Sequence, residues 1–205
     1  MTNATDALQR LREGNGRFVS GTGGADALRG AARRREVAPN QNPFAVILGC
    51  SDSRVPAELV FDQGLGDLFV IRIAGNIVAP SQVGSVEFAV EAFGTPLVVV
   101  LGHTQCGVIQ ATLEELTRTG TNRSHNVRSI VDRVRPSVEP LLQTPLRNDR
   151  DALVREAVRA NVRASANQLR HGSEVIENLV ERKGLRIVGA EYCLDTGVVE
   201  FFEGV

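Results

Sequence analysis

Phe44-Ala-Val-Ile-Leu-Gly49, followed at once by Cys50-Ser-Asp-Ser-Arg54, is the stretch of sequence that decides the fold. A short apolar run bounded by turn residues is typical of a strand buried on both faces of a sheet. Similar apolar runs recur three more times, and segments with helical periodicity separate them. These further runs are 68–73, 96–102 and 185–190. Strands that alternate with helices predict a parallel sheet covered on both faces.

We therefore predict an α/β fold with a mainly parallel sheet of four strands plus an antiparallel edge strand, and helices on both faces. The edge strand is expected at 198–202, after a turn at 195–197. The segment 20–43 is expected to wrap the core as loop and helix fragments. The main helices are expected at 4–19 and 83–93, in a segment after Gly107, and within 124–143 and 151–183.

Local signals predict where some of these helices begin and end. Gly14 and Gly16 are expected to interrupt the first helix, because glycine weakens a helix interior. Asp151 is a candidate N-cap for the last helical segment, and Gly172 or Gly184 is its candidate stop.

The length and composition fit one globular domain. The chain has 205 residues, of which 42% are hydrophobic and 23% are charged. We expect a single domain spanning 1–205, with an N-terminal helical arm of about residues 1–40. A formal net charge of −1 gives no electrostatic argument for binding nucleic acid or an anionic membrane. No apolar stretch approaches the ~20 residues of a membrane helix, and the N-terminus lacks a secretory pattern, so we expect a cytoplasmic protein.

Two short blocks carry the residue types of a metal site. Cys50 comes directly after the first predicted strand, and His103-Thr-Gln-Cys106 comes directly after the third. In an open α/β sheet, sites form beyond the carboxyl ends of the strands at a topological switch point, so we expect both blocks at one edge. Two thiolates and one imidazole leave a tetrahedral Zn²⁺ one ligand short, and an open position is typical of catalytic zinc.

Asp52 and Arg54 lie close enough to the first cysteine to act on a water bound to the metal. Asp52 can accept a hydrogen bond from that water, and Arg54 can hold Asp52 by a two-pronged contact. The alternative is a structural ion pair at a loop. A structural zinc site would need a fourth ligand; Cys193 is the remaining cysteine, and we expect it to be a small buried hydrophobe. His125 and His171 are expected on helix surfaces.

A nucleotide-binding module is a rival interpretation. Gly102 and Gly107 have the glycine spacing of a phosphate loop after a strand, but Val108-Ile109 stands where that motif needs Lys and Ser or Thr. Gly64-Leu-Gly66 lacks the third glycine of a dinucleotide fingerprint and is better interpreted as a turn. Arg33-Arg34-Arg35 has no interleaved aromatic residues, so we expect a solvated face.

The two metal blocks resemble the beta-class carbonic anhydrases, which carry Cys-x-Asp-x-Arg and then His-x-x-Cys about fifty residues later. The similarity extends from about residue 40 to about residue 115. It includes Gln41, Cys50 to Glu58, Phe69 to Arg72, and His103 to Gly107. The resemblance implies a zinc enzyme that reversibly hydrates carbon dioxide to bicarbonate and a proton, by attack of zinc-bound hydroxide. The alternatives are a zinc hydrolase of a related linear molecule such as carbon disulfide, and a non-catalytic zinc protein on the same fold.

The resemblance also implies two possible roles for Asp52. In the family, the equivalent aspartate pairs with an arginine, here Arg54, or in some members moves onto zinc and closes the site as a fourth ligand. Members that close in this way commonly carry a Trp three residues before the first cysteine, where this chain has Ile47. We therefore favour the plant-like, open-site subtype.

The substrate pocket and the assembly are also implied by the resemblance. Gln41 and Phe69 match pocket residues of plant-like members, and Gly107 is placed to hold a substrate oxygen with its backbone N–H. Phe88 stands where those members have a pocket Tyr, so one hydroxyl is missing. The family assembles as homodimers or multiples of them, such as tetramers, with the pocket near the interface. An N-terminal helix with an apolar face and no evident core of its own to cover agrees with this.

Overall fold

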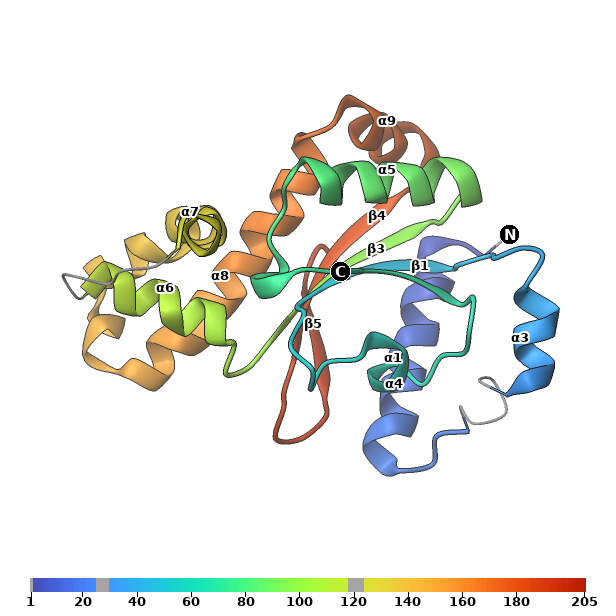
Figure 1. Cartoon of the computed structure of the whole chain (residues 1–205), viewed down its shortest axis with the longest axis horizontal. Coiled ribbons are helices and arrows are strands. Elements are labelled where there is room, and N and C mark those ends of the chain that lie inside the picture. Colours follow the sequence, from blue (N-terminus) through green and yellow to red (C-terminus); the bar gives the residue numbers. More distant parts are fainter. Residues whose placement is uncertain (1, 25–29, 118–123) are drawn as a thin grey trace.

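The computed structural model describes residues 2–24, 30–117 and 124–205, and its centre is a five-stranded sheet (Figure 1). The strands lie in the order β2-β1-β3-β4-β5, and the pairs β1–β2, β1–β3 and β3–β4 are parallel. β5 pairs antiparallel with β4 and forms one edge. The bounds are β1 Ala45–Gly49, β2 Leu68–Arg72, β3 Leu97–His103, β4 Arg186–Tyr192 and β5 Val199–Glu203. The predicted fold class is confirmed.

Helices cover both faces of the sheet (Figure 1). Their bounds are α1 Ala4–Ser20, α3 Ala31–Val37, α4 Ala57–Val60, α5 Pro80–Phe93, α6 Gly107–Thr117, α7 His125–Val138, α8 Arg150–His171 and α9 Glu174–Lys183. In the described ranges, short 3₁₀ turns accompany them: η1 Ala74–Asn76, η2 Glu139–Gln143 and η3 Pro145–Asn148. α1 and α4 pack on one face, and α5, α8 and α9 pack on the other. Within the described ranges, no helix combines the length and apolarity needed to cross a bilayer.

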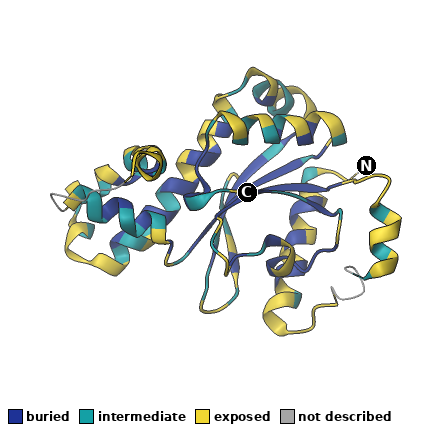
Figure 2. Cartoon of the chain, viewed as in Figure 1, coloured by how far each residue is buried: buried dark blue, intermediate teal, exposed yellow. Residues whose placement is uncertain are grey.

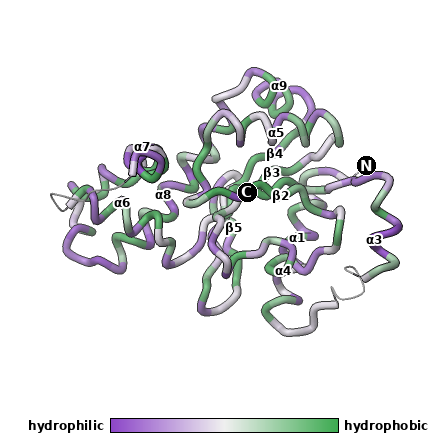
Figure 3. Tube along the Cα trace, viewed as in Figure 1, coloured by the Kyte–Doolittle hydropathy of each residue, from purple (hydrophilic) through white to green (hydrophobic). Residues whose placement is uncertain are grey.

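The inner strands are buried on both faces, as their uninterrupted apolar sequences predict. Every residue of β1 and β3 is buried (Figure 2). The hydropathy trace shows the same concentration of hydrophobic residues along the centre of the sheet (Figure 3). A third apolar cluster joins α6, α7 and α8 beyond the carboxyl ends of the strands, and it includes Cys50 and Cys106.

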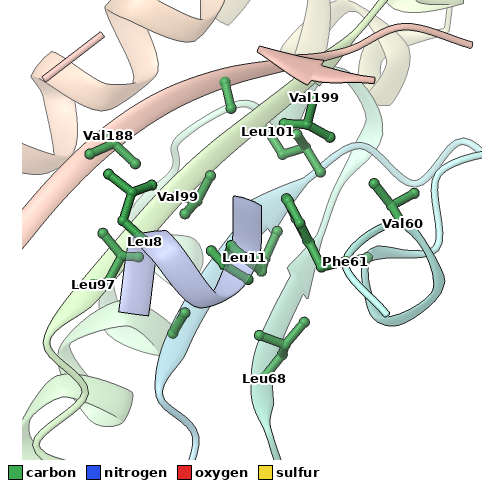
Figure 4. Packing of buried hydrophobic residues seen from close by; sticks show 14 of the residues in the cluster. Leu8, Leu11, Val60, Phe61, Leu68, Leu97, Val99, Leu101, Val188 and Val199 are labelled. Atoms are coloured by element: carbon green, nitrogen blue, oxygen red, sulfur yellow. The ribbon is translucent and has the colours of Figure 1, made fainter. Parts of the chain in front are cut away.

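Helix α1 packs on its own sheet, which differs from the expectation that its apolar face has nothing to cover. Leu8 and Leu11 are buried against strands of the same chain (Figure 4). The buried Asn15 donates to the carbonyl oxygens of Val60 and Gly197, at 3.1 and 2.8 Å. The apolar face of α1 therefore gives no argument for a partner chain.

Two predicted helix boundaries are wrong, each for a local reason. Gly14 and Gly16 do not interrupt α1, which runs unbroken to Ser20. Gly14 is needed for close packing, because a Cβ built there would lie 1.9 Å from the carbonyl oxygen of Phe61. At α8, the N-cap is Asp149 rather than Asp151, since its carboxylate accepts the Ala152 N–H at 3.0 Å.

Other local predictions are confirmed or refined. Gly172 ends α8 and Gly184 ends α9, so each proposed stop is used once. His125 and His171 are exposed on helices. Cys193 is half-buried rather than buried, because it lies in the turn between β4 and β5, where its N–H bonds to the Val198 carbonyl.

The two glycines of α1 form a matched pair for testing this packing. Gly14→Ala should destabilise the protein by about 1–3 kcal/mol or more, because the new methyl group collides with backbone. Gly16 has nothing within 4 Å of a built Cβ, so Gly16→Ala should stabilise by about 0.5–1 kcal/mol. Urea unfolding at one protein concentration measures both. Equal effects of the two substitutions would contradict this account of Gly14.

Candidate metal centre

The candidate ligands lie where the sheet reverses its order of strand addition. β1 is flanked by β2 on one side and by β3 on the other, so the carboxyl ends of β1 and β3 form the switch point. Cys50 follows β1 directly, and His103 is the last residue of β3 rather than the first residue after it. The expectation that both blocks reach one edge of the sheet is confirmed.

Cys50, His103 and Cys106 form a buried cluster suited to a metal ion. Their candidate ligand atoms all lie within 4.8 Å of one another. The Nδ1 of His103 lies 2.9 Å from the Thr104 carbonyl oxygen, which favours a proton on Nδ1 and leaves Nε2 with a lone pair. That Nε2 is buried without a hydrogen-bond partner among the described residues. An orphaned imidazole nitrogen beside two sulfurs is the donor set that zinc prefers.

The two sulfurs lie close enough for a hydrogen bond from the Cys106 thiol to reach Cys50. The hydrogen bond from Cys106 stabilises the Cys50 thiolate and holds the pKa of Cys50 well below its ordinary value. The same bond, together with burial, raises the pKa of Cys106. Backbone N–H groups at the start of α6 act in the opposite direction on Cys106. A dication between the sulfurs would replace the proton of this hydrogen bond and stabilise both thiolates.

Asp52 is held by Arg54 at the mouth of this cluster. The Arg54 side chain donates two hydrogen bonds to the carboxylate, at 2.9 and 2.7 Å, and its backbone N–H donates a third at 3.0 Å. The side-chain bonds from Arg54 keep the pKa of Asp52 well below its usual range. One carboxylate oxygen is 3.8 Å from Nε2 of His103. The anion therefore lies beside the candidate metal ligands.

Arg72 is a structural contributor that the sequence did not reveal. Its guanidinium donates to the carbonyl oxygens of Cys50 and Asp52, at 3.1 and 2.6 Å. Arg72 is the last residue of β2, and in the sheet it lies opposite Gly49. It therefore fixes the loop that carries both a ligand and the carboxylate. Arg72 ends the stretch Phe69 to Arg72 that resembles the family, but the sequence carries no sign of these contacts.

The four predicted pocket residues are not all brought together in one chain. Gly107 follows Cys106 directly and begins α6, so it lies at the site. Phe69 pairs with Val46, four residues before Cys50, which is about 13 Å along the strand. Gln41 precedes the opposite end of β1 and is exposed. Phe88 is 56% exposed and lies 6.2 Å from Phe69, measured between ring centroids.

The ligand assignment can be tested by metal content. Cys106→Ser should lose most bound zinc, because a hydroxyl is a far poorer zinc ligand than a thiolate. Cys193→Ser is the matched control, since Cys193 lies outside the cluster and should be dispensable for binding. Zinc per chain is measured by emission spectrometry after gel filtration. Full zinc occupancy in Cys106→Ser would refute the assignment.

The chain is similar in sequence to known carbonic anhydrases. The family model described as carbonic anhydrase matches residues 45–199. Carbonic anhydrase 2 of Mycobacterium tuberculosis is 41% identical over 198 residues, covering 96% of this chain and 91% of the relative. A carbonic anhydrase of Mycolicibacterium smegmatis is also 41% identical, over 97% of this chain and 93% of its own.

Solved structures agree on the fold. A chain described among two tetrameric beta-carbonic anhydrases of Sordaria macrospora matches with a TM-score of 0.73 at 23% identity, covering 82% of this chain and 84% of that one. This structural similarity shows the fold alone, and membership of the family is shown by the sequence matches. Together with the cluster of two cysteines and a histidine, they establish that the chain belongs to the beta-class carbonic anhydrase family.

Proposed function

We propose that this protein is a zinc enzyme that reversibly hydrates carbon dioxide to bicarbonate and a proton. The observation that carries the proposal is the pairing of three buried metal-ligand atoms with an arginine-held carboxylate 3.8 Å from one of them. A structural zinc site has no use for such a carboxylate. The names of the two mycobacterial relatives support the same activity.

In this proposal, Cys50, His103 and Cys106 hold the zinc, which supplies a nucleophile at neutral pH by lowering the pKa of a bound water. Two thiolates donate charge and weaken this effect, so the chain has to compensate. Asp52 does so by accepting a hydrogen bond from the nucleophile and orienting it. Arg54 keeps Asp52 ionised and pointed at the site, and the N–H of Gly107, the first residue of α6, orients a substrate oxygen.

We propose that the apolar part of the pocket is completed by a second copy of the chain. Gln41, Phe69 and Phe88 lie away from the metal ligands of their own chain. Phe88 is 56% exposed, with its ring tilted against Phe69 and edge-to-face with Phe93. An exposed aromatic cluster favours burial in an interface. The tetrameric Sordaria relatives support a homodimer or a multiple of it. Carbon dioxide has no charge or dipole, so an apolar wall suits it.

We also propose one domain spanning 1–205, in which the N-terminal arm of about residues 1–40 wraps the sheet. The contacts of α1 with the core support this organisation. A cytoplasmic location is a further proposal. The three cysteines are free thiols in the structure, and thiolate ligands are most durable in a reducing compartment.

Direct assay of carbon dioxide hydration tests the function. The zinc-loaded protein should accelerate hydration in a stopped-flow indicator assay, and Asp52→Asn should retain zinc while losing about 10²-fold to 10⁴-fold in rate. The amide still accepts a hydrogen bond but lacks the charge. Asp151→Asn, an exposed acid on α8, is the control and should keep the wild-type rate.

The same assay separates the alternatives. Hydrolysis of carbon disulfide without carbon dioxide hydration would replace the proposed substrate. If Asp52→Asn keeps the wild-type rate of both reactions, Asp52 takes no part in the mechanism. If the zinc-loaded wild type catalyses neither reaction, the chain is a non-catalytic zinc protein.

We propose further that the resting enzyme is of the plant-like, open-site subtype, with Asp52 on Arg54. The support is the three hydrogen bonds between them and the presence of Ile47 where closing members have Trp. Since pairing depresses the pKa of Asp52, the stabilisation by the ion pair is complete above the ordinary aspartate pKa of about 3.9. It is lost only as pH falls through the lowered value.

The pairing of Asp52 should therefore be independent of pH between about 6 and 8. Crystal structures of the zinc-loaded protein at both ends of this range should show the Asp52 carboxylate on Arg54. A carboxylate bound to zinc at either end of this range, with Arg54 unpaired, would overturn the open-site proposal but not the proposed activity.

A further inference from the structure

A tight corner between β2 and α5 lies directly behind one of the zinc ligands. It is the 3₁₀ turn η1, in which Gly75 has φ of 73° and Asn76 has φ of 43°. Both values are in the left-handed region, which L residues rarely adopt. A Cβ at Gly75 would lie 2.8 Å from Cγ1 of Val108, so the corner is also sterically closed to a larger residue. Such a strained conformation persists only where surrounding structure holds it.

The corner directs a backbone donor at the Cys50 sulfur. The Gly75 N–H donates to Sγ at 3.3 Å, in a buried environment. Hydrogen bonds from N–H groups to an ionised acceptor stabilise its charge and fix its direction. Gly75 therefore orients the sulfur from the side of the loop, whereas Arg72 holds only the carbonyl oxygens of that loop.

Two polar side chains of α8 hold the corner in place. The Asn161 Nδ2 donates to the Gly75 carbonyl oxygen at 2.9 Å, and the Ser165 Oγ donates to the Asn76 carbonyl oxygen at 3.1 Å. Asn161 is 2% exposed and Ser165 is 5% exposed. Residues four apart lie on the same face of a helix, so one face of α8 supports two successive carbonyls of the turn.

The same helix is locked against the strand that carries His103. Gly102, immediately before it, is so close to α8 that a built Cβ would lie 2.6 Å from Cγ2 of Val162 and 3.2 Å from Cγ1 of Val158. Asn161 lies between these two valines in sequence. α8 therefore fixes the corner behind Cys50 and the backbone before His103 at the same time.

We infer that Asn161 and Ser165 are positioning residues of the zinc site, which act on Cys50 through the Gly75 N–H. The inference rests on the zinc centre of the proposed function. A purely structural role would affect only the stability of the turn. A positioning role also changes the metal–sulfur bond, and this effect distinguishes the two.

The test compares Asn161→Ala and Ser165→Ala with Asn167→Ala, an exposed asparagine on the same helix. Zinc dissociation into excess chelator should be about 10-fold to 100-fold faster in Asn161→Ala, the usual effect of losing a group that orients a ligand. Ser165→Ala should show a smaller change in the same direction. Asn167→Ala should match the wild type.

Cobalt substitution supplies a readout that a purely structural role would not move. In the Co²⁺-loaded protein, the sulfur-to-metal charge-transfer band should shift to longer wavelength in Asn161→Ala, because a thiolate without its N–H donor gives up an electron more easily. Unchanged band position and unchanged zinc dissociation in folded variants would overturn the inference. If Asn161→Ala does not fold, Ser165→Ala decides by the same two measurements. Zinc content of the wild type, measured first, tests the zinc site separately.

Discussion

The parallel pairing of β1 with β3 is the constraint on which the site depends. The register sets Gly49 opposite Leu101, so Cys50 and His103 emerge from neighbouring strand ends. Each strand is buried along its whole length, and a slip of one residue would turn every side chain to the wrong face. The core that stabilises the fold therefore also fixes the separation of two ligands. Cys106 is brought to the same place because the chain turns from the end of β3 at His103 into α6, which begins at Gly107.

A second layer of contacts refines what the sheet provides. Thr104 accepts a hydrogen bond from the His103 ring, and its own N–H bonds to the Tyr192 carbonyl of β4. Arg72 braces the Cys50 loop from β2. The ligands are thus held by a side chain of β2 on one side of the switch point and by backbone groups of Thr104 and β4 on the other. Such support is what keeps a metal site within the tolerance that chemistry requires.

Sequence reasoning succeeded where local pattern and topology determine the outcome. The apolar runs predict the five strands. The positions of Cys50, His103 and Cys106 at or just after strand ends predict their cluster. It failed where the deciding contact is distant in sequence. Gly14 has the local signature of a helix breaker, but the contact that requires a glycine there is with the Phe61 carbonyl, far along the chain. The contacts of Asn161 and Ser165 span 86 and 89 residues and leave no local signal.

The pocket residues show a different limit. The resemblance implies Gln41 and Phe69, but Gln41 precedes β1 and Phe69 lies within β2, which separates both from the metal ligands of the same chain. A sequence pattern records that residues act together, but it does not record whether they belong to one chain or two. Strand register shows only how far along the sheet each residue lies. The separation is compatible with the proposed assembly, whereas the apolar face of α1 is covered by its own sheet.

Asp52 links the stability of the loop to the chemistry of the site. Two cations would compete for its carboxylate. One is the guanidinium of Arg54, and the other is a metal ion bound by ligands that include the nearby His103 Nε2. Arg54 is half exposed, so solvent and salt weaken its attraction, while the metal side is buried. Geometry compensates: three hydrogen bonds from one residue orient the carboxylate, and Arg72 anchors its backbone. The direction of the Asp52 carboxylate therefore depends less on the strength of one ion pair than on how rigidly the Cys50–Arg54 loop is held.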